Sequence, residues 1–141
     1  MDTIEFFVDG KPVGKQRPKF NSKQRRTYTP KKTKNWEEHI QNIFKQFDFH
    51  KIPSGIPVFV SVYAYFIPPK SWSKHTRTAY MRDNTLHTSK PDCDNVLKCV
   101  LDALNGLAYE DDKQVYGAFI VKRYDQREGL SIRVKAAEEG C

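Results

Sequence analysis

Alternating apolar residues along this 141-residue chain predict four β-strands. The predicted strands cover residues 4–8, 58–67, 114–124 and 130–134. Both faces of the segment 58–67 are largely apolar or aromatic, so this strand is expected to be central in a sheet, and the pair Pro68-Pro69 ends it. Residues 11–28 show no helical period and predict an extended loop, with a short strand at residues 26–28.

Apolar residues at helical spacing predict three helices. The first follows a Thr-Pro pair at residues 29–30, which is typical of a helix cap and first helical position. Its apolar face consists of Trp36, Ile40, Ile43, Phe44 and Phe47. A short helix is predicted over residues 71–81, resting on Trp72, Ala79 and Tyr80, and a third helix over residues 95–104. The third is expected to end at Asn105-Gly106, a common helix stop.

The order of these elements predicts one α+β domain over residues 1–141, built as a single mixed β-sheet with helices packed on it. No repeat, linker or low-complexity stretch divides the chain, and the tail at residues 136–141 is expected to be frayed. The longest apolar run, residues 58–67, is too short to span a bilayer. The first residues lack the layout of a secretory signal, which favours a cytoplasmic protein.

Charge adds a feature that the apolar pattern does not show. The 24 Lys and Arg residues exceed the 17 Asp and Glu residues, for a net charge of +7. Ten of the basic residues and no acidic one lie in residues 11–36, so the remaining residues carry −3. A block of this kind attracts polyanions such as nucleic acid, and the alternative is a solvated basic loop without a ligand.

The cysteines and histidines exclude two other kinds of site. Cys93, Cys99 and Cys141 form no even set and no Cys-x-x-Cys pair, so no disulfide framework is expected, in keeping with a reducing cytosol. The four histidines are scattered without the spacing of zinc ligands.

Acidic residues gather around the predicted helix over residues 95–104. Asp92 and Asp94 precede its apolar face, and an extended backbone there would point both side chains to one side. Lys98 and Asp102 follow at intervals of one turn. The alternative is structural: Asp94 caps the helix, Asp92 favours its positive end, and Lys98 pairs with both of its neighbouring acids.

A second acidic cluster, Glu110-Asp111-Asp112, lies in the loop before the next strand. Three consecutive carboxylates repel each other unless a cation neutralises them, and the two clusters together can converge on Mg²⁺. An EF-hand is excluded because Leu97 stands where glycine is required. No P-loop exists, so no nucleotide cofactor is expected. A Gly-x-Ser-x-Gly nucleophile elbow is also absent.

The residues that carry these clusters resemble the RusA-type Holliday junction resolvases. The central signature reads Lys90-Pro91-Asp92-x-Asp94-Asn95-x-x-Lys98, then Asp102-Ala-Leu-Asn-Gly106, then Asp111-Asp112-x-Gln114-Val115. The segment Gly10-Lys11-Pro12-x-Gly14-Lys15-x-Arg17-Pro18 and residues 26–30 resemble the Gram-positive and prophage branch of that family. The resemblance covers most of the chain.

This resemblance implies a homodimeric, Mg²⁺-dependent endonuclease that cuts four-way DNA junctions by paired nicks in DNA recombination and repair, with Mn²⁺ as a substitute metal. It implies that Asp92, Asp94 and Asp112 are catalytic metal ligands, with Asp111 assisting. Lys98 would be the essential catalytic lysine, with Asn95 and Asp102 as structural support and Asp102 holding Lys98.

The basic block would then bind the arms of the junction. The expected DNA-binding residues are Lys11, Lys15, Arg17, Lys19, Arg25, Arg26, Lys31, Lys32 and Lys90. Three aromatic residues, Phe20, Tyr28 and Trp72, are candidates to stack on bases or wedge between them, with ordinary packing as the alternative.

Two other functions remain open at this point. One is a basic nucleic-acid-binding module whose acids are purely structural. The other is a phosphohydrolase that uses Asp92 as nucleophile and Asp94 as acid, although residues 82–91 predict a polar loop where such an enzyme has a strand.

Overall fold

The computed structural model describes residues 3–17, 19–28 and 30–137, without the side chains of residues 19 and 28. It confirms the predicted α+β class with a mixed sheet. The elements in chain order are β1 (Thr3–Asp9), β2 (Lys19–Asn21), β3 (Arg26–Tyr28), α1 (Lys31–Lys45), β4 (Val58–Phe66), α2 (Lys74–Arg82), α3 (Cys93–Leu104), the 3₁₀ turn η1 (Asp112–Gln114), β5 (Val115–Tyr124) and β6 (Gly129–Ala136).

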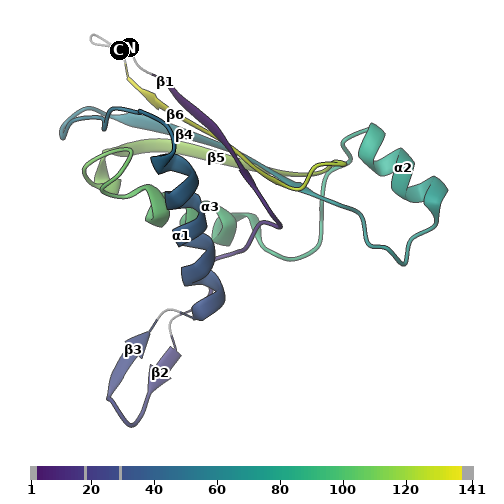
Figure 1. Cartoon of the computed structure of the whole chain (residues 1–141), viewed down its shortest axis with the longest axis horizontal. Coiled ribbons are helices and arrows are strands. Elements are labelled where there is room, and N and C mark those ends of the chain that lie inside the picture. Colours follow the sequence, from purple (N-terminus) through teal and green to yellow (C-terminus); the bar gives the residue numbers. More distant parts are fainter. Residues whose placement is uncertain (1–2, 18, 29, 138–141) are drawn as a thin grey trace.

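Four strands form the main sheet in the order β1-β6-β4-β5. β6 pairs antiparallel with both β1 and β4, whereas β4 and β5 run parallel. β4 therefore has a neighbour on each side, which confirms its predicted central position. The parallel pair requires a crossover, and the chain makes it through α2 and α3 (Figure 1).

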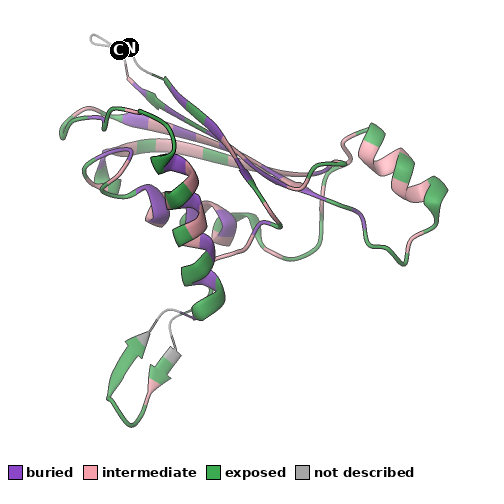
Figure 2. Cartoon of the chain, viewed as in Figure 1, coloured by how far each residue is buried: buried purple, intermediate pink, exposed green. Residues whose placement is uncertain are grey.

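One face of this sheet forms the core. Val58, Val60 and Val62 of β4 are fully buried, whereas the alternate residues of the strand are only partly covered. α1 and α3 pack against each other and lie on the buried side of the sheet, as the purple stripes in Figure 2 show. Their buried apolar residues are Trp36, Ile40 and Phe44 on α1 and Val96, Val100 and Leu104 on α3.

Several predicted boundaries need correction. α2 starts at Lys74, with Ser73 as its N-cap, rather than at residue 71, so Trp72 precedes the helix. Pro30 occupies the N-cap of α1, so the helix itself starts at Lys31, and Thr29 lies outside the described residues. α3 begins at Cys93, two residues earlier than predicted, which places Asp94 in its first turn rather than in an extended stretch. The predicted frayed tail is too long, because β6 reaches Ala136 and the next backbone N–H donates to a carbonyl 2.8 Å away; residues 138–141 lie outside the described part.

Aromatic rings attach α2 to the end of the sheet. Trp72 packs edge-on against Tyr80, with ring centroids 4.9 Å apart, and both rings contact Tyr124 of β5. His87 stacks on the ring of Phe66 at 3.9 Å. Burial, together with the nearby charges of two lysines, lowers the pKa of His87 to about 4, so this histidine is neutral near pH 7.

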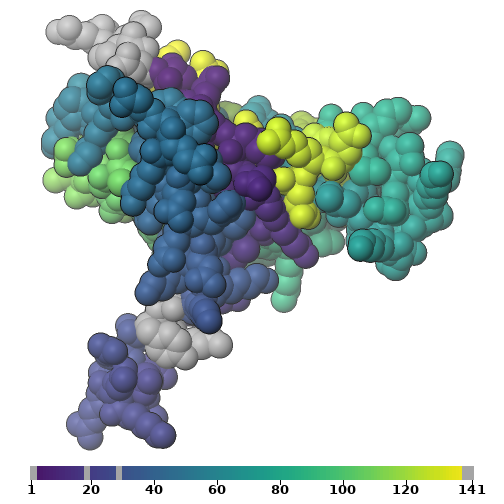
Figure 3. Space-filling model, in the orientation of Figure 1, coloured from purple at the N-terminus to yellow at the C-terminus, as the bar shows by residue number. Residues whose placement is uncertain are grey.

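The basic segment contains a hairpin that the sequence pattern predicted only in part. β3 matches the short strand expected at residues 26–28, and β2 is its antiparallel partner. The hairpin extends away from the body of the protein (Figures 1 and 3). None of the helices in the described part of the chain is long and apolar enough to cross a membrane.

Candidate functional site

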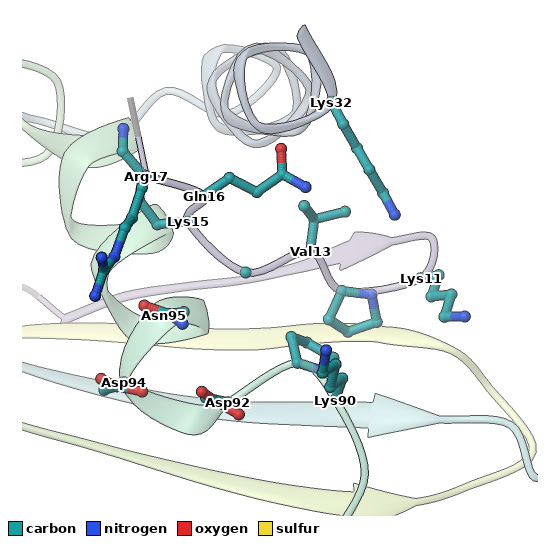
Figure 4. Close-up of a pocket in the computed structure, with 13 residues that line it drawn as sticks. Lys11, Val13, Lys15, Gln16, Arg17, Lys32, Lys90, Asp92, Asp94 and Asn95 are labelled. Carbon is teal, nitrogen blue, oxygen red and sulfur yellow. The ribbon is translucent and has the colours of Figure 1, made fainter. Parts of the chain in front are cut away.

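A groove of about 1070 Å³ opens where the loop after β1 passes the N-terminal end of α3 (Figure 4). Basic side chains from that loop, from α1 and from the segment before α3 share this groove with carboxylates at the start of α3. The lining residues are Lys11, Pro12, Val13, Gly14, Lys15, Gln16, Arg17, Lys32, Lys90, Pro91, Asp92, Asp94 and Asn95.

Asp92 and Asp94 both present exposed carboxylates to the groove. Asp92, rather than Asp94, occupies the N-cap position of α3, and the Asp92 side chain forms no capping hydrogen bond. The structural alternative, in which Asp94 caps the helix, is therefore wrong. The backbone places two acids at the positive end of a helix while leaving their oxygens available to a ligand.

The loop after β1 is attached to two helices by its backbone. A Cβ on Gly14 would lie 3.1 Å from the Cβ of Asn95, so only glycine allows this close approach without a shift. The next N–H, that of Lys15, donates to the Asn95 carbonyl at 2.8 Å. The N–H of Gln16 donates to Oγ1 of the fully buried Thr33 on α1, at 3.2 Å. The loop thus bridges α1 and α3.

Lys122 of β5 holds the segment that leads into the acidic residues. Its ammonium donates to the carbonyls of Ser89 and Pro91, each at 2.7 Å, immediately before Asp92. Pro91 also lies 3.0 Å from the position of a Cβ on Gly14. This role was not predicted from the sequence. A lysine at a strand position where the alternation places side chains toward the core could have indicated it.

Lys15 forms an ion triad with one acid from each helix. Its Nζ lies 3.2 Å from both carboxylate oxygens of Glu37 on α1 and 3.1 Å from Oδ2 of Asp102 on α3. Burial lowers the pKa of Lys15, but hydrogen bonds to Asp102 and Glu37 outweigh it and leave the pKa raised. Two expectations change: Asp102 pairs with Lys15 rather than with Lys98, and the Lys15 charge is neutralised within the protein instead of being free for DNA.

The three acids of the second cluster have different partners: Glu110 lies 3.5 Å from the Lys51 ammonium, whereas Asp111 and Asp112 interact with each other. Asp111 accepts a hydrogen bond from the Lys113 N–H at 3.2 Å and forms a capping box with Gln114 at η1. The Lys113 N–H and the side chain of Asp112 lower the pKa of Asp111. The pKa of Asp112 is raised, first by its hydrogen bond with Asp111 and then by burial and neighbouring acids that include Asp102. Asp112 is exposed.

The structure brings together two of the three predicted metal ligands. Asp92 and Asp94 line the groove, whereas Asp112 lies on η1 outside the lining. Within residues 3–17, 19–28 and 30–137, no group of three or more His, Cys, Asp or Glu side chains is close enough to hold a metal ion. The donor chemistry nevertheless fits Mg²⁺, which usually binds one or two protein carboxylates and completes its shell with water and substrate phosphate.

Most of the predicted DNA-binding cations are exposed, but they fall into two places. Lys11, Arg17, Lys32 and Lys90 line the groove, and Lys31 lies beside it at the start of α1. Arg25 and Arg26 belong to the hairpin, and the Lys19 side chain lies outside the described part. On α3, exposed Lys98 follows Asp94 by one turn and forms no ion pair with another described residue.

The buried cysteine beside this site is not a reactive group. Burial, aided by the negative charge of Glu37, raises the pKa of the Cys99 thiol to about 12, so it stays protonated at neutral pH. Cys93 and Cys99 are both free thiols, and Cys141 lies outside the described residues. The chemistry of the groove therefore rests on its carboxylates and lysines.

Comparison with known proteins identifies the same elements. The family model described as Endodeoxyribonuclease RusA matches residues 9–135, from the end of β1 into β6. The chain is also 32% identical over 139 residues to the uncharacterized protein YqaN of Bacillus subtilis (strain 168), covering 96% of this chain and 97% of that protein. The family match includes the basic loop, the acidic start of α3 and η1. This chain therefore belongs to the RusA family of endodeoxyribonucleases, which are hydrolases acting on DNA.

Proposed function

We propose that this protein is a Mg²⁺-dependent endodeoxyribonuclease that resolves four-way DNA junctions by paired cuts in recombination and repair. The observation that carries the proposal is the groove in which exposed cations share a wall with the carboxylates of Asp92 and Asp94, which form no ion pair with another described residue. Membership of the family supports hydrolysis of DNA as the reaction. The residues that line the groove support the groove as the active site. The unpaired acids also argue against a binding module whose acids are purely structural.

The residues divide the work between holding and cutting. Lys11, Lys32 and Lys90 would contact backbone phosphates and fix the position of the strand. Asp92 and Asp94, which line the groove, would hold the metal. When bound, Mg²⁺ supplies Lewis-acid chemistry and lowers the pKa of water. The ammonium of Lys98, one turn beyond Asp94, would place positive charge where negative charge develops on the scissile phosphate.

The substrate range is the direct test of this function. The experiment incubates the wild-type protein with a synthetic four-way junction, a flap and a plain duplex of the same sequence, each with and without Mg²⁺. We expect paired nicks in the junction alone, and only with the metal. Equal cutting of all three substrates would contradict junction selectivity, and cutting in EDTA would contradict the metal requirement.

A homodimer is part of this proposal, because paired cuts require two active sites. The sheet face opposite α1 and α3 carries an aromatic patch formed by Phe59, Tyr63, Tyr116 and Phe119, whose neighbouring rings lie 5.6 to 6.0 Å apart. Tyr116 is 64% exposed and Phe119 is 37% exposed. Beside the patch, Glu5 of β1 and Arg133 of β6 present one negative and one positive charge on the same face. A face that carries both signs of charge suits contact with a two-fold-related copy of itself.

Phe119→Glu is expected to convert the dimer to a monomer, because a charge in an apolar interface is buried without a partner. Sedimentation equilibrium measures the mass of each variant, and Leu86→Glu, at an exposed apolar residue outside the patch, is the control. Monomeric Phe119→Glu should give single nicks in place of paired ones. A dimer that survives this substitution would move the interface elsewhere.

A further inference from the structure

The structure separates the three aromatic residues that were candidates for base contact. Trp72 packs against Tyr80 and Tyr124, so its ring has a structural role in attaching α2 to the sheet. The Tyr28 side chain lies outside the described part. Phe20, on strand β2 of the hairpin, is 63% exposed. Among the described side chains of these candidates, Phe20 is the one that presents its ring to solvent.

The tip of the hairpin has a defined shape. Asn21 pairs with Arg26 across the two strands, and its Oδ1 accepts hydrogen bonds from the N–H groups of Lys23 and Gln24 at 3.0 and 3.2 Å. Arg25 adopts a positive φ of 51°, which reverses the chain direction. An Asn side chain that bonds the backbone ahead of it stabilises such a turn locally. These contacts fix the shape of the turn and, with it, the position of Phe20 within the hairpin.

The surroundings of this hairpin indicate a ligand of negative charge. Lys23, Arg25 and Arg26 are exposed around the turn, and residues 11–36 contain no acid that could neutralise them. Figure 3 shows the hairpin standing clear of the body, and Figure 2 shows it almost wholly exposed. A two-stranded hairpin gains little stability by itself, and the exposed ring of Phe20 in the middle of β2 is not part of the buried core of the described chain.

We propose that the β2–β3 hairpin enters the branch point of a DNA junction and that Phe20 stacks there on a base that lacks its neighbour. Arg25 and Arg26 would contact the flanking phosphates. Every base has a flat face on which an aromatic ring can stack, and an intact duplex keeps those faces covered. Phe20 would therefore discriminate branched DNA from duplex DNA, whereas the cations alone would bind both. This inference rests on the proposed function, because it assigns the junction selectivity of that function to one residue.

Binding measured in EDTA tests this role without any cutting. Phe20→Ala is expected to weaken binding to a four-way junction about 10-fold and to leave binding to a duplex of the same sequence unchanged. Phe20→Trp, which keeps an aromatic ring at this position, should bind the junction with the wild-type affinity. Its added tryptophan fluorescence, taken against the wild-type background of Trp36 and Trp72, should be quenched by the junction and not by the duplex. Leu86→Ala, which removes another exposed apolar side chain, is the matched control.

The outcomes separate this inference from the proposed function. Equal losses of junction and duplex affinity in Phe20→Ala would show that the hairpin is only a general DNA-binding arm, and unchanged junction affinity would likewise overturn the role of Phe20. Either result leaves the proposed function intact if the wild-type protein still nicks junctions with Mg²⁺. A wild-type protein that binds junction and duplex equally would overturn this inference alone, whereas a wild-type protein that does not nick junctions with Mg²⁺ would overturn the proposed function.

Discussion

Asp94→Asn is expected to abolish Mg²⁺-dependent nicking of a four-way junction while junction binding stays the same or tightens. The substitution keeps the size and backbone position of the side chain in the first turn of α3 and removes one negative charge from the groove. Loss of a group that holds the metal should cost at least about 100-fold in rate. Removing an acid that faces a polyanion should not weaken binding.

The control for this experiment is Asp48→Asn. Asp48 is exposed beyond the C-terminal end of α1 and does not line the groove, so the same change of charge there tests the effect of net charge alone. Nicking rates and junction affinities are measured for both variants across a range of Mg²⁺ concentrations. Wild-type nicking by Asp94→Asn would remove Asp94 from the metal site, and weakened binding would instead make it a DNA contact.

The second large effect is expected at Lys15. Lys15→Met keeps most of the aliphatic length but leaves the carboxylates of Glu37 and Asp102 facing each other without a cation. Breaking such a pair should lower the free energy of unfolding by about 2 to 3 kcal/mol, less than in a fully buried pair because Asp102 is partly exposed. Urea denaturation measures the change. Adding Asp102→Asn to Lys15→Met should regain part of the loss.

The same variant distinguishes a positioning residue from a DNA contact. Lys11→Met, at an exposed cation of the same loop, should reduce the slope of log affinity against log salt by about 0.9 for each DNA phosphate that the protein no longer neutralises. Lys15→Met should leave that slope unchanged and lower the nicking rate, because the loop keeps its backbone hydrogen bonds to α1 and α3 but loses the side-chain ion pairs that help to position it. A reduced slope in Lys15→Met would return Lys15 to the DNA-binding set.

The pH dependence of the Lys15 triad gives a further check on the same variant. Because the folded protein raises the pKa of Lys15 above its ordinary value of 10.5, the stabilisation is fully present below that pH and is lost only as pH rises through the raised pKa. The stability difference between wild type and Lys15→Met should therefore be constant from neutral to mildly alkaline pH. A difference that changes across neutral pH would assign it to another titrating group.

Local residue patterns were sufficient for the elements and for the identity of the acids. The alternation along β4 predicted a central strand because both of its faces are apolar or aromatic. Such a strand is typically found inside a sheet, with a neighbouring strand along each edge. The Asp-x-Asp-Asn segment predicted a chemical centre at the start of α3, because hard oxygen ligands near a basic segment suit a metal and a phosphate. The β2 strand was missed because three residues are too few to show a period, and the length of α3 was misjudged because its first turn is polar.

The net charge and its division into a basic block and an acidic remainder follow from composition, so the sequence alone determined that this protein suits a polyanion and a cation together. Only the tertiary structure decided which charges are available to them. In the sequence nothing distinguishes Lys15 from the other basic residues of its segment. In the structure two acids on different helices, 22 and 87 residues further along the chain, neutralise its charge. Lys122 likewise reaches across from the sheet to hold the segment before Asp92. Pairings of this kind depend on how helices and strands pack, and no local spacing encodes that packing.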